Sequence, residues 1–182
     1  MTSTVSLDAL TAGVEAPITY ALDTGEKPVN ETFEAGQVIR RRTGATQTRI
    51  TRIQDARPLQ HELSLDRNGF ALVPHPTAVS DFFDAAQLRD VYYPEIERLV
   101  REVSGAQRVV VFDHTLRTGD EGERQARKIR EPVLWAHNDY TDWSGPQRLR
   151  EILPDEASVL LQHRFAIIQV WRPIQPRIER NP

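Results

Sequence analysis

The chain has 182 residues, 39% of them hydrophobic, with 23 basic and 26 acidic side chains and a formal net charge of -3. This composition is that of an ordinary globular chain, most simply one domain, and its charge excludes long-range attraction to nucleic acid or to an anionic membrane. No cysteine is present, so disulfides and a cysteine nucleophile are excluded and a metal site has to use histidine and carboxylate. The beginning of the chain has neither a basic start nor a long apolar run, and we expect a cytoplasmic protein.

Residues 1–36 are punctuated by proline and glycine and contain one strand-like piece, Ile18–Leu22. They are predicted to form an N-terminal arm, followed by one domain over residues 37–182. At the start of that domain, Arg49–Ile53 alternates with period two, which predicts a strand with one solvated face.

Three apolar runs further along the chain predict strands. The first, Phe70–Val73, follows the turn signal Asn68-Gly69, and together with the alternating residues before that turn it predicts a β-hairpin. The second, Arg108–Phe112, is a β-branched run of the kind found in central strands. The third, Arg164–Pro173, is an apolar strand stopped by its proline.

A helix is predicted between the first two of these runs. Ser80 or Asp81 is its expected N-cap, and apolar residues recur with a three-to-four spacing as far as Val100. Pro94 is expected to kink or split this helix, and Gly105 to end it. The charged stretch 118–130 is expected to be a loop, and short helical turns are expected over 147–152 and 156–162.

The stretch 131–141, EPVLWAHNDYT, contains the candidate metal ligands His137 and Asp139. Side chains two residues apart on an extended strand project to the same side, so one metal ion could be bound by both. The apolar residues before the pair and the strand-favouring residues after it predict that it lies on a strand. The alternative interpretation is a histidine and an aspartate on a polar turn, each hydrogen-bonded to backbone.

Five motifs in this order carry a family resemblance: LDRNGFALVPHPTAVSDFFD, YYPEIERLV, VVVFDHTLR, AHNDYT and RFAIIQVWRPI. From about Ile18 onward the chain resembles the fungal and bacterial hydroxylase/desaturase group that includes the AsaB-like and CmcJ-like proteins of secondary metabolism. The resemblance implies a mainly β fold with flanking helices (α+β), namely a double-stranded β-helix or jelly roll. It also implies mononuclear iron(II), with 2-oxoglutarate as co-substrate and dioxygen.

In that family the His-x-Asp pair, here His137 and Asp139, provides two iron ligands. The third, a distal histidine, lies beyond the WRPI motif, whereas this sequence stops at Pro182 and is expected to lack the later strands. We therefore expect a fragment of a longer protein, a degenerate homologue, or a variant that recruits another ligand, and we expect the chain by itself to be poorly active or to self-associate. The candidates for a substitute ligand are His61, His75, His114 and His163, and we favour His114 because it ends a predicted strand.

Three arginines are candidate ligands of the 2-oxoglutarate carboxylates. Arg172 lies at the end of the last predicted strand and could bind a carboxylate through its planar guanidinium group. The alternative for Arg172 is a salt bridge that closes the end of the strand. Arg117 and Arg148 are weaker candidates of the same kind.

The resulting hypothesis is an oxidoreductase, an iron(II)/2-oxoglutarate-dependent dioxygenase that hydroxylates, desaturates or rearranges a small metabolite. His137 and Asp139 would be its catalytic metal ligands. A second hypothesis is a non-catalytic jelly-roll protein that binds a small molecule or a partner subunit. A third is a zinc hydrolase using the same pair, and the absence of a second HxH or of an HExxH motif from the sequence counts against it. We expect a small-molecule substrate, no nucleic-acid or membrane partner, and a homodimer as one option.

Overall fold

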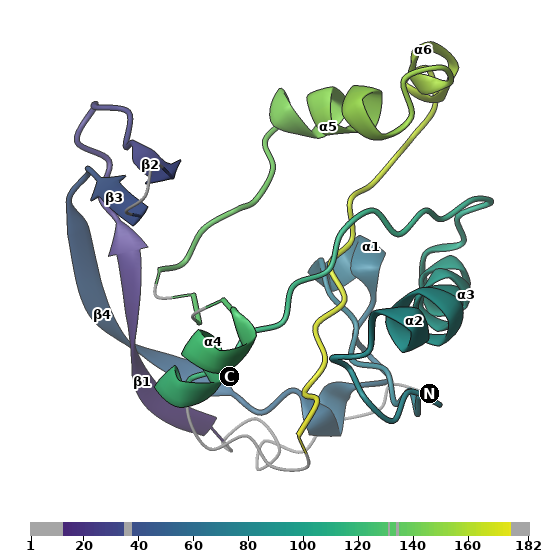
Figure 1. The fold of residues 1–182 in the computed structure, drawn as a ribbon, viewed down its shortest axis with the longest axis horizontal. Helices are drawn as coiled ribbons and strands as arrows, with labels where there is room; N and C mark the ends of the chain where they lie inside the picture. Colours follow the sequence, from purple (N-terminus) through teal and green to yellow (C-terminus); the bar gives the residue numbers. More distant parts are fainter. Residues whose placement is uncertain (1–12, 35–37, 131, 134, 176–182) are drawn as a thin grey trace, which may run out of the picture. The chain divides into compact units, whose positions relative to one another are not determined.

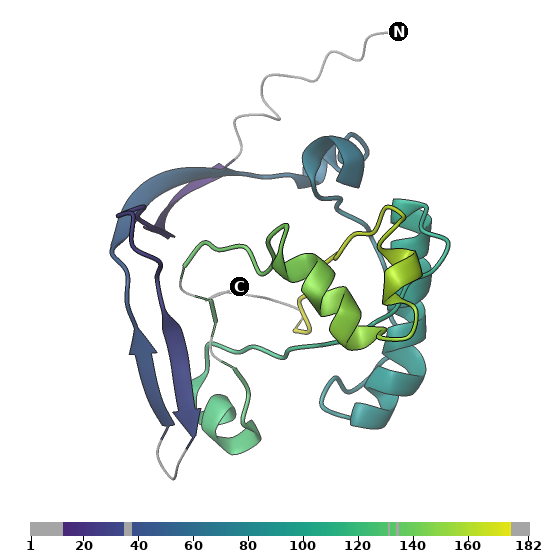
Figure 2. The ribbon, with the colours of Figure 1, turned by 90° about the horizontal axis from the view of Figure 1, so that it is seen from above.

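The computed structural model of the chain describes residues 13–34, 38–130, 132–133 and 135–175 (Figures 1 and 2). The chain divides into two compact units, Met1–Asp55 with Val133–Asp139, and Ala56–Pro132 with Tyr140–Pro182. Among the described residues, the strands belong to the first unit and the helices to the second. Residues 1–12, 35 and 36 of the predicted N-terminal arm lie outside the described residues, and the domain boundary at residue 37 stays a prediction.

A long antiparallel strand pair is the main element of the first unit (Figure 1). It consists of β1 (Gly13–Ala21) and β4 (Thr46–Gln54), in a register that places Ala21 opposite Thr46. The β-branched threonine and isoleucine residues of β4 favour this extended conformation. Both strands that the sequence predicts in this part of the chain are therefore confirmed.

A shorter hairpin lies between these strands in sequence. It pairs β2 (Asn30–Glu34) with β3 (Val38–Arg42) in antiparallel fashion. Beyond the ends of these two strands, the backbone N–H of Thr43 donates to the carbonyl of Val29 at 2.9 Å. The hydrogen bonding of this hairpin therefore extends one step beyond β2 and β3. In sequence, the hairpin connects β1 to β4.

The face of β4 differs from its prediction. Its period-two pattern predicts one solvated and one covered face, but Ile50 is 69% exposed and Ile53 is 43% exposed. Within the first unit, no further described strand joins the β1–β4 pair. Alternation along a strand therefore predicted the extended backbone correctly, because that depends on local preference, but not the layer that would cover it.

A run of helical turns forms the main element of the second unit. It comprises α2 (Ala85–Gln87), the π-helical turn η2 (Leu88–Tyr92) and α3 (Tyr93–Ser104). Pro94 stands in the first turn of α3, where its missing N–H costs no helical hydrogen bond. The π-helical turn η2 ends at Tyr92, directly before α3, so the irregularity predicted at Pro94 lies just before the proline. Gly105, with φ 70°, ends the helix as predicted.

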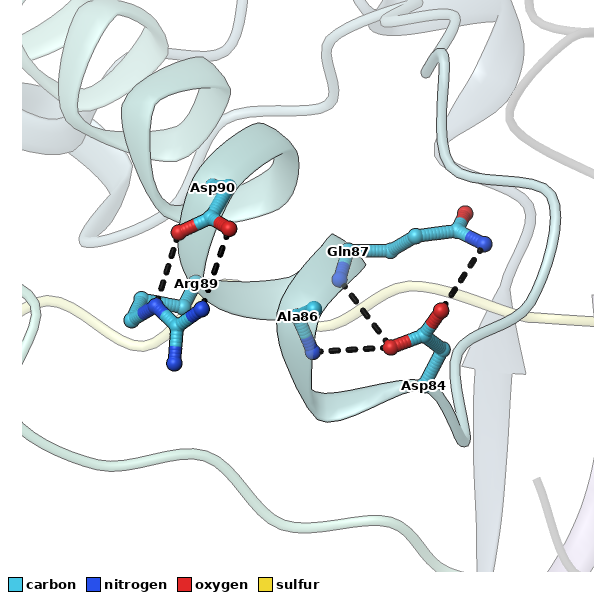
Figure 3. Close-up of polar contacts among 5 residues, drawn as sticks. All are labelled: Asp84, Ala86, Gln87, Arg89 and Asp90. Carbon is cyan, nitrogen blue, oxygen red and sulfur yellow. Dashed lines mark hydrogen bonds and ion pairs between the residues drawn. The ribbon is translucent and has the colours of Figure 1, made fainter.

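The N-cap of this run is Asp84, not Ser80 or Asp81 as predicted. Its Oδ1 accepts the backbone N–H groups of Ala86 at 2.8 Å and Gln87 at 3.4 Å (Figure 3). These hydrogen bonds, with that of Ala86 the strongest influence, hold the pKa of the Asp84 carboxyl below its ordinary value. Ser80 instead donates its backbone N–H to the side-chain oxygen of Gln87 at 2.9 Å. A cap at residue 84 satisfies the first free N–H groups of α2 directly.

The predicted hairpin over residues 61–73 is wrong. Asn68-Gly69 does reverse the chain, but as the end of one helical turn, α1 (Leu65–Asn68). Ser64 caps its beginning by accepting the N–H of Arg67 at 3.4 Å, and Gly69 closes its end with φ 77°. The left-handed conformation that favours glycine is common to hairpin turns and helix ends, so the turn signal did not distinguish them.

The other predicted strands are also absent as strands. Phe70–Val73, Arg108–Phe112 and Arg164–Pro173 have no helical conformation, and none of them belongs to a strand ladder within the described residues. A β-branched sequence favours extended backbone, but a strand also requires a neighbour that accepts and donates its hydrogen bonds. The local preference was predicted correctly and the pairing was not.

Three further helices lie in the second unit. The predicted loop 118–130 contains α4 (Glu121–Arg127), whose N-cap Asp120 accepts the N–H of Glu123 at 2.8 Å. The loop prediction is therefore wrong for these residues. The predicted short turns are confirmed as α5 (Ser144–Ile152) and α6 (Ala157–Leu160).

The most buried apolar side chains of the described residues form a small set: Val79, Leu88, Ile96 and Ala157, each at most 8% exposed. Leu88 and Ile96 come from η2 and α3, so the predicted buried face of this helical run is confirmed. Within the described ranges, no helix is long and apolar enough to cross a membrane.

Candidate metal site

The segment that carries His137 and Asp139 is held to the first unit by one backbone contact. The N–H of Ala136 donates to the carbonyl of Thr19 in β1 at 2.9 Å, and Ala136 forms an isolated parallel bridge with Tyr20. The prediction of a strand over 131–141 is therefore wrong, because the described part of the stretch has this single bridge. Glu131 and Leu134 of the stretch lie outside the described residues.

The two candidate ligands nevertheless face each other. His137 Nε2 lies 3.0 Å from Asp139 Oδ1, and the two side chains are 48% and 45% exposed. The other ring nitrogen, Nδ1, lies 2.8 Å from the backbone carbonyl oxygen of Trp135. A carbonyl can only accept, so Nδ1 carries the ring proton of this bond and Nε2 is the nitrogen that faces the carboxylate.

This arrangement fits the donor set of a divalent metal. Two ligands in neighbouring positions, each about 2.1 Å from an ion, lie about 3.0 Å apart when the angle between them is near a right angle. A ligating histidine usually donates its second N–H to a carbonyl or carboxylate, which fixes the ring and its tautomer. The same distance also suits an ion pair between imidazolium and carboxylate. Within the part of the chain that the structure describes, no group of three histidine or acidic side chains is placed to hold a metal ion.

The histidines considered as substitute ligands all belong to the second unit. His75 and His114 are engaged: Nδ1 of His75 lies 2.8 Å from Nη2 of Arg172, and Nδ1 of His114 is hydrogen-bonded to the hydroxyl of Tyr93. His61 and His163 are exposed.

Arg172, the first candidate for binding 2-oxoglutarate, is bound to the chain itself. Its Nη2 donates to the backbone oxygen of His75 at 2.6 Å as well as contacting that ring. The guanidinium carbon lies 5.8 Å from the centre of the Tyr92 ring. Its Nε is buried and has no hydrogen-bond partner among the described residues. The contact is with a histidine, so the described residues do not show the predicted salt bridge, and carboxylate recognition by Arg172 stays a prediction.

The two weaker arginine candidates occupy other surroundings. Arg148 in α5 pairs with Glu151 of the same helix at 3.1 Å, and its guanidinium carbon lies 5.3 Å from the centre of the Phe112 ring. Arg117 forms an isolated backbone bridge with Arg130. Their roles in co-substrate binding stay predictions.

Glu95 is a buried acid that the sequence analysis missed. It is 9% exposed, and its carboxylate accepts the hydroxyl of Thr77 at 2.5 Å and the backbone N–H of Ala78 at 2.9 Å. Burial raises the pKa of Glu95, but these two hydrogen bonds and the charges of His75 and Arg172 outweigh burial and lower the pKa. The available signal was its place in YYPEIERLV, next to Ile96 on the apolar face of the predicted helix.

Comparison with protein families gives one match over most of the chain. The family model described as "Oxidoreductase/YMDC permease-like domain" matches residues 18–182. Oxidoreductase AN1597 of Emericella nidulans is 36% identical over 137 residues, which cover 72% of this chain and 46% of that protein. Hydroxylase/desaturase CTB9 of Cercospora beticola is 34% identical over 141 residues, 71% of this chain and 44% of that protein. The chain thus spans about half the length of the curated relatives it matches, and the resemblance to the hydroxylase/desaturase group is confirmed.

Solved structures show the same relationship at the level of the fold. A structure of the iron and alpha-ketoglutarate-dependent endoperoxidase NvfI superimposes with a TM-score of 0.66 at 22% identity, covering 84% of this chain and 56% of that one. A second NvfI structure gives a TM-score of 0.63 at 23% identity, covering 83% and 56%. The chain therefore shares its fold with part of that enzyme.

Proposed function

This chain belongs to the YDMC family, described as the oxidoreductase/YMDC permease-like domain, and we propose that it works as a non-haem iron(II)- and 2-oxoglutarate-dependent oxygenase of a small metabolite. The observation that carries the proposal is the 3.0 Å approach of His137 Nε2 to Asp139 Oδ1. Relatives named hydroxylase/desaturase and alpha-ketoglutarate-dependent dioxygenase support the same chemistry. Hydroxylation, desaturation and rearrangement are the reaction types proposed.

In this proposal His137 and Asp139 are two of the iron ligands. The Trp135 carbonyl, 2.8 Å from Nδ1 of His137, holds the ring so that Nε2 is directed at the ion. Iron(II) and 2-oxoglutarate supply the activation of dioxygen, with 2-oxoglutarate oxidised to succinate and carbon dioxide. The half-exposed position of the pair leaves one side open to a co-substrate and a substrate.

We also propose that the strands of the first unit belong to a double-stranded β-helix. The superposition on NvfI over 84% of the chain supports this architecture. Arg172 is the preferred ligand of a 2-oxoglutarate carboxylate, since its buried Nε has a donor to offer. Arg148 also has a buried Nε without a hydrogen-bond partner among the described residues, but its guanidinium is already paired with Glu151, so it stays a weaker candidate. A homodimer and a cytoplasmic location remain part of the proposal.

Succinate formation tests the proposed reaction without knowledge of the metabolite. The full chain is incubated with Fe²⁺, 2-oxoglutarate and dioxygen, because enzymes of this kind turn over the co-substrate slowly when their substrate is missing. Succinate above the background of the matched variant His137→Ala/Asp139→Ala is the expected result. Equal succinate from both proteins would contradict the proposal.

A second candidate is a non-catalytic protein of the same fold that binds a small molecule. A pocket of about 340 Å³ in the second unit favours it, because this pocket is formed by residues other than His137 and Asp139. Binding of a small molecule with no succinate formed under the conditions above would support this candidate over the oxygenase.

A further inference from the structure

The pocket in the second unit is assigned no role by the proposed oxygenase reaction. Its volume is about 340 Å³ and it opens to solvent. Three stretches of chain line it: residues 82–88, from the turn before α2 into η2; residues 114–116, after the extended run 108–112; and residues 127–130, at the end of α4 and after it. The lining residues are Phe82, Phe83, Ala85, Leu88, His114, Thr115, Leu116, Arg127, Lys128, Ile129 and Arg130.

The apolar wall of the pocket is firmly packed. Leu88 is 5% exposed and belongs to the small core of the unit. The ring of Phe82 packs edge-on against Tyr92, with 5.2 Å between ring centres. Phe83 is 41% exposed, and the guanidinium carbon of Arg127 lies 4.2 Å from its ring centre. The wall therefore offers aromatic surface that a flat apolar group can cover.

The polar side of the pocket is formed by cations. Arg127 is neutralised by Glu123, with 2.7 Å between Nε and Oε2. Lys128 and Arg130 are exposed, and no ion pair is recorded for either among the described residues. Their backbone is nevertheless fixed: Lys128 closes α4 with φ 54°, and the Arg130 carbonyl accepts the N–H of Thr118 at 3.3 Å.

His114 adds a ring nitrogen to the same side. Its Nδ1 is hydrogen-bonded to the hydroxyl of Tyr93, and the two rings lie edge to face, 5.7 Å apart. Burial, followed by the charge of Asp113, raises the pKa of the Tyr93 phenol, so the phenol keeps the proton that it donates. When the phenol donates to Nδ1, the N–H of the ring lies on Nε2 and can donate to a ligand.

We propose that this pocket binds a small organic carboxylate with a flat apolar body. The body would lie on Phe82, Phe83 and Leu88, and the carboxylate would accept from Lys128, Arg130 and the His114 ring. No acidic side chain is among the lining residues that the structure describes, so this part of the pocket is complementary to an anion. The inference goes beyond the proposed oxygenase activity, because no metal takes part in this binding.

Isothermal titration of the metal-free full chain tests the proposal with matched probes. We expect 2-naphthoate to bind with a dissociation constant of about 1 mM, typical for a ligand of this size. Its neutral analogue 2-naphthalenemethanol should bind at least about fivefold more weakly, the effect of losing exposed ionic contacts. Inorganic phosphate and 2-oxoglutarate, which lack the apolar body, should also bind more weakly. Equal binding of naphthoate and its alcohol, or tighter binding of either polar anion, would overturn the proposal, as would no binding of naphthoate.

Variants locate the binding in the pocket. Lys128→Gln/Arg130→Gln removes two exposed charges and should weaken naphthoate binding about fivefold, while leaving binding of the alcohol within about twofold. Arg101→Gln removes an exposed cation of α3 outside the pocket and should leave naphthoate binding unchanged. An equal loss in the Arg101 variant, or no loss in the double variant, would show that the pocket is not the site. The comparison of naphthoate with its alcohol on the unmodified chain decides the charge requirement even if the double variant fails to fold.

Discussion

Nε2 of His137 and Oδ1 of Asp139 lie 3.0 Å apart, and the described part of their segment is joined to β1 by a single bridge at Ala136. The orientation comes from a local bond instead, the 2.8 Å contact between His137 Nδ1 and the carbonyl of Trp135. Because that carbonyl accepts a hydrogen bond from the N–H at Nδ1, Nε2 faces the carboxylate. The side chains of His137 and Asp139 are thus oriented toward each other by contacts within a few residues of the chain.

We expect this pair to bind a divalent metal. His137→Ala and Asp139→Ala should each weaken binding of Co²⁺, used as an oxygen-stable substitute for Fe²⁺, by more than about tenfold, since loss even of a residue that supports a ligand costs that much. Calorimetric titration under identical buffer gives the affinities. Asp142→Ala removes an exposed carboxylate three residues further along and serves as the control, with an affinity like that of the unmodified chain. Unaltered affinity in the double variant His137→Ala/Asp139→Ala would exclude the site.

The other histidines are expected not to complete this site. Within the described residues, no group of three histidine or acidic side chains is placed to hold a metal ion. Alanine at each of these positions, and at His61 and His163, should change the Co²⁺ affinity by no more than about twofold, the ordinary size of a surface effect. The four variants are titrated side by side. A large loss in one of them would identify the third ligand within the chain and would correct our interpretation of that histidine.

The sequence predicted those parts of the fold that depend on neighbouring residues. The alternation in Arg49–Ile53, the apolar spacing around Ile96 and the glycine at position 105 act within a few residues, and each is confirmed. The wrong predictions concern which segments pair with each other as strands. The run Arg108–Phe112 has strong strand preference but no ladder among the described residues, and a partner strand cannot be read from the run itself.

For the candidate site, the spacing of His137 and Asp139 predicted that their side chains lie on the same side, and the two side chains are close together. The predicted cause, a strand, is wrong. A strand was expected, whereas the ring is oriented by a carbonyl two residues earlier in the chain. The cationic pocket could not be predicted, since it joins Phe83 to Lys128 and Arg130 across a long stretch of chain. Contacts of this kind depend on tertiary structure, and no local pattern records them.

The helical core of the second unit should be sensitive to lost volume. Ile96 is 7% exposed, and Ile96→Ala should lower the free energy of unfolding by about 2 to 4 kcal/mol through lost burial and the cavity left behind. Urea denaturation followed by circular dichroism measures the change. Val159→Ala, at a position 59% exposed in α6, is the control and should cost less than about 1 kcal/mol. Similar losses in both variants would mean that Ile96 is not part of a packed core.

The carboxylate of Glu95 should make stability depend on pH. Glu95→Gln keeps the shape but removes the charge that accepts from Thr77 and Ala78, so we expect it to lower the free energy of unfolding by about 1 to 2 kcal/mol at pH 7. The folded state lowers the pKa of this carboxyl below its ordinary value of 4.5, despite burial. Its contribution is therefore complete above the pKa of the unfolded chain and is lost as the pH falls through the lower pKa of the folded chain.

The difference between the unmodified chain and Glu95→Gln should consequently shrink as the pH is lowered from about 6 to below 4.5, where the unfolded chain takes up the proton first. Urea denaturation at a series of pH values measures both proteins. Glu102→Gln removes an exposed carboxylate from the same helix and should give a difference that stays small throughout. A Glu95→Gln effect that is constant over this range would show that the side chain contributes through its shape and not through its charge. An effect that grows in acid would mean that the folded state raises the pKa of Glu95, with burial outweighing the hydrogen bonds of Thr77 and Ala78.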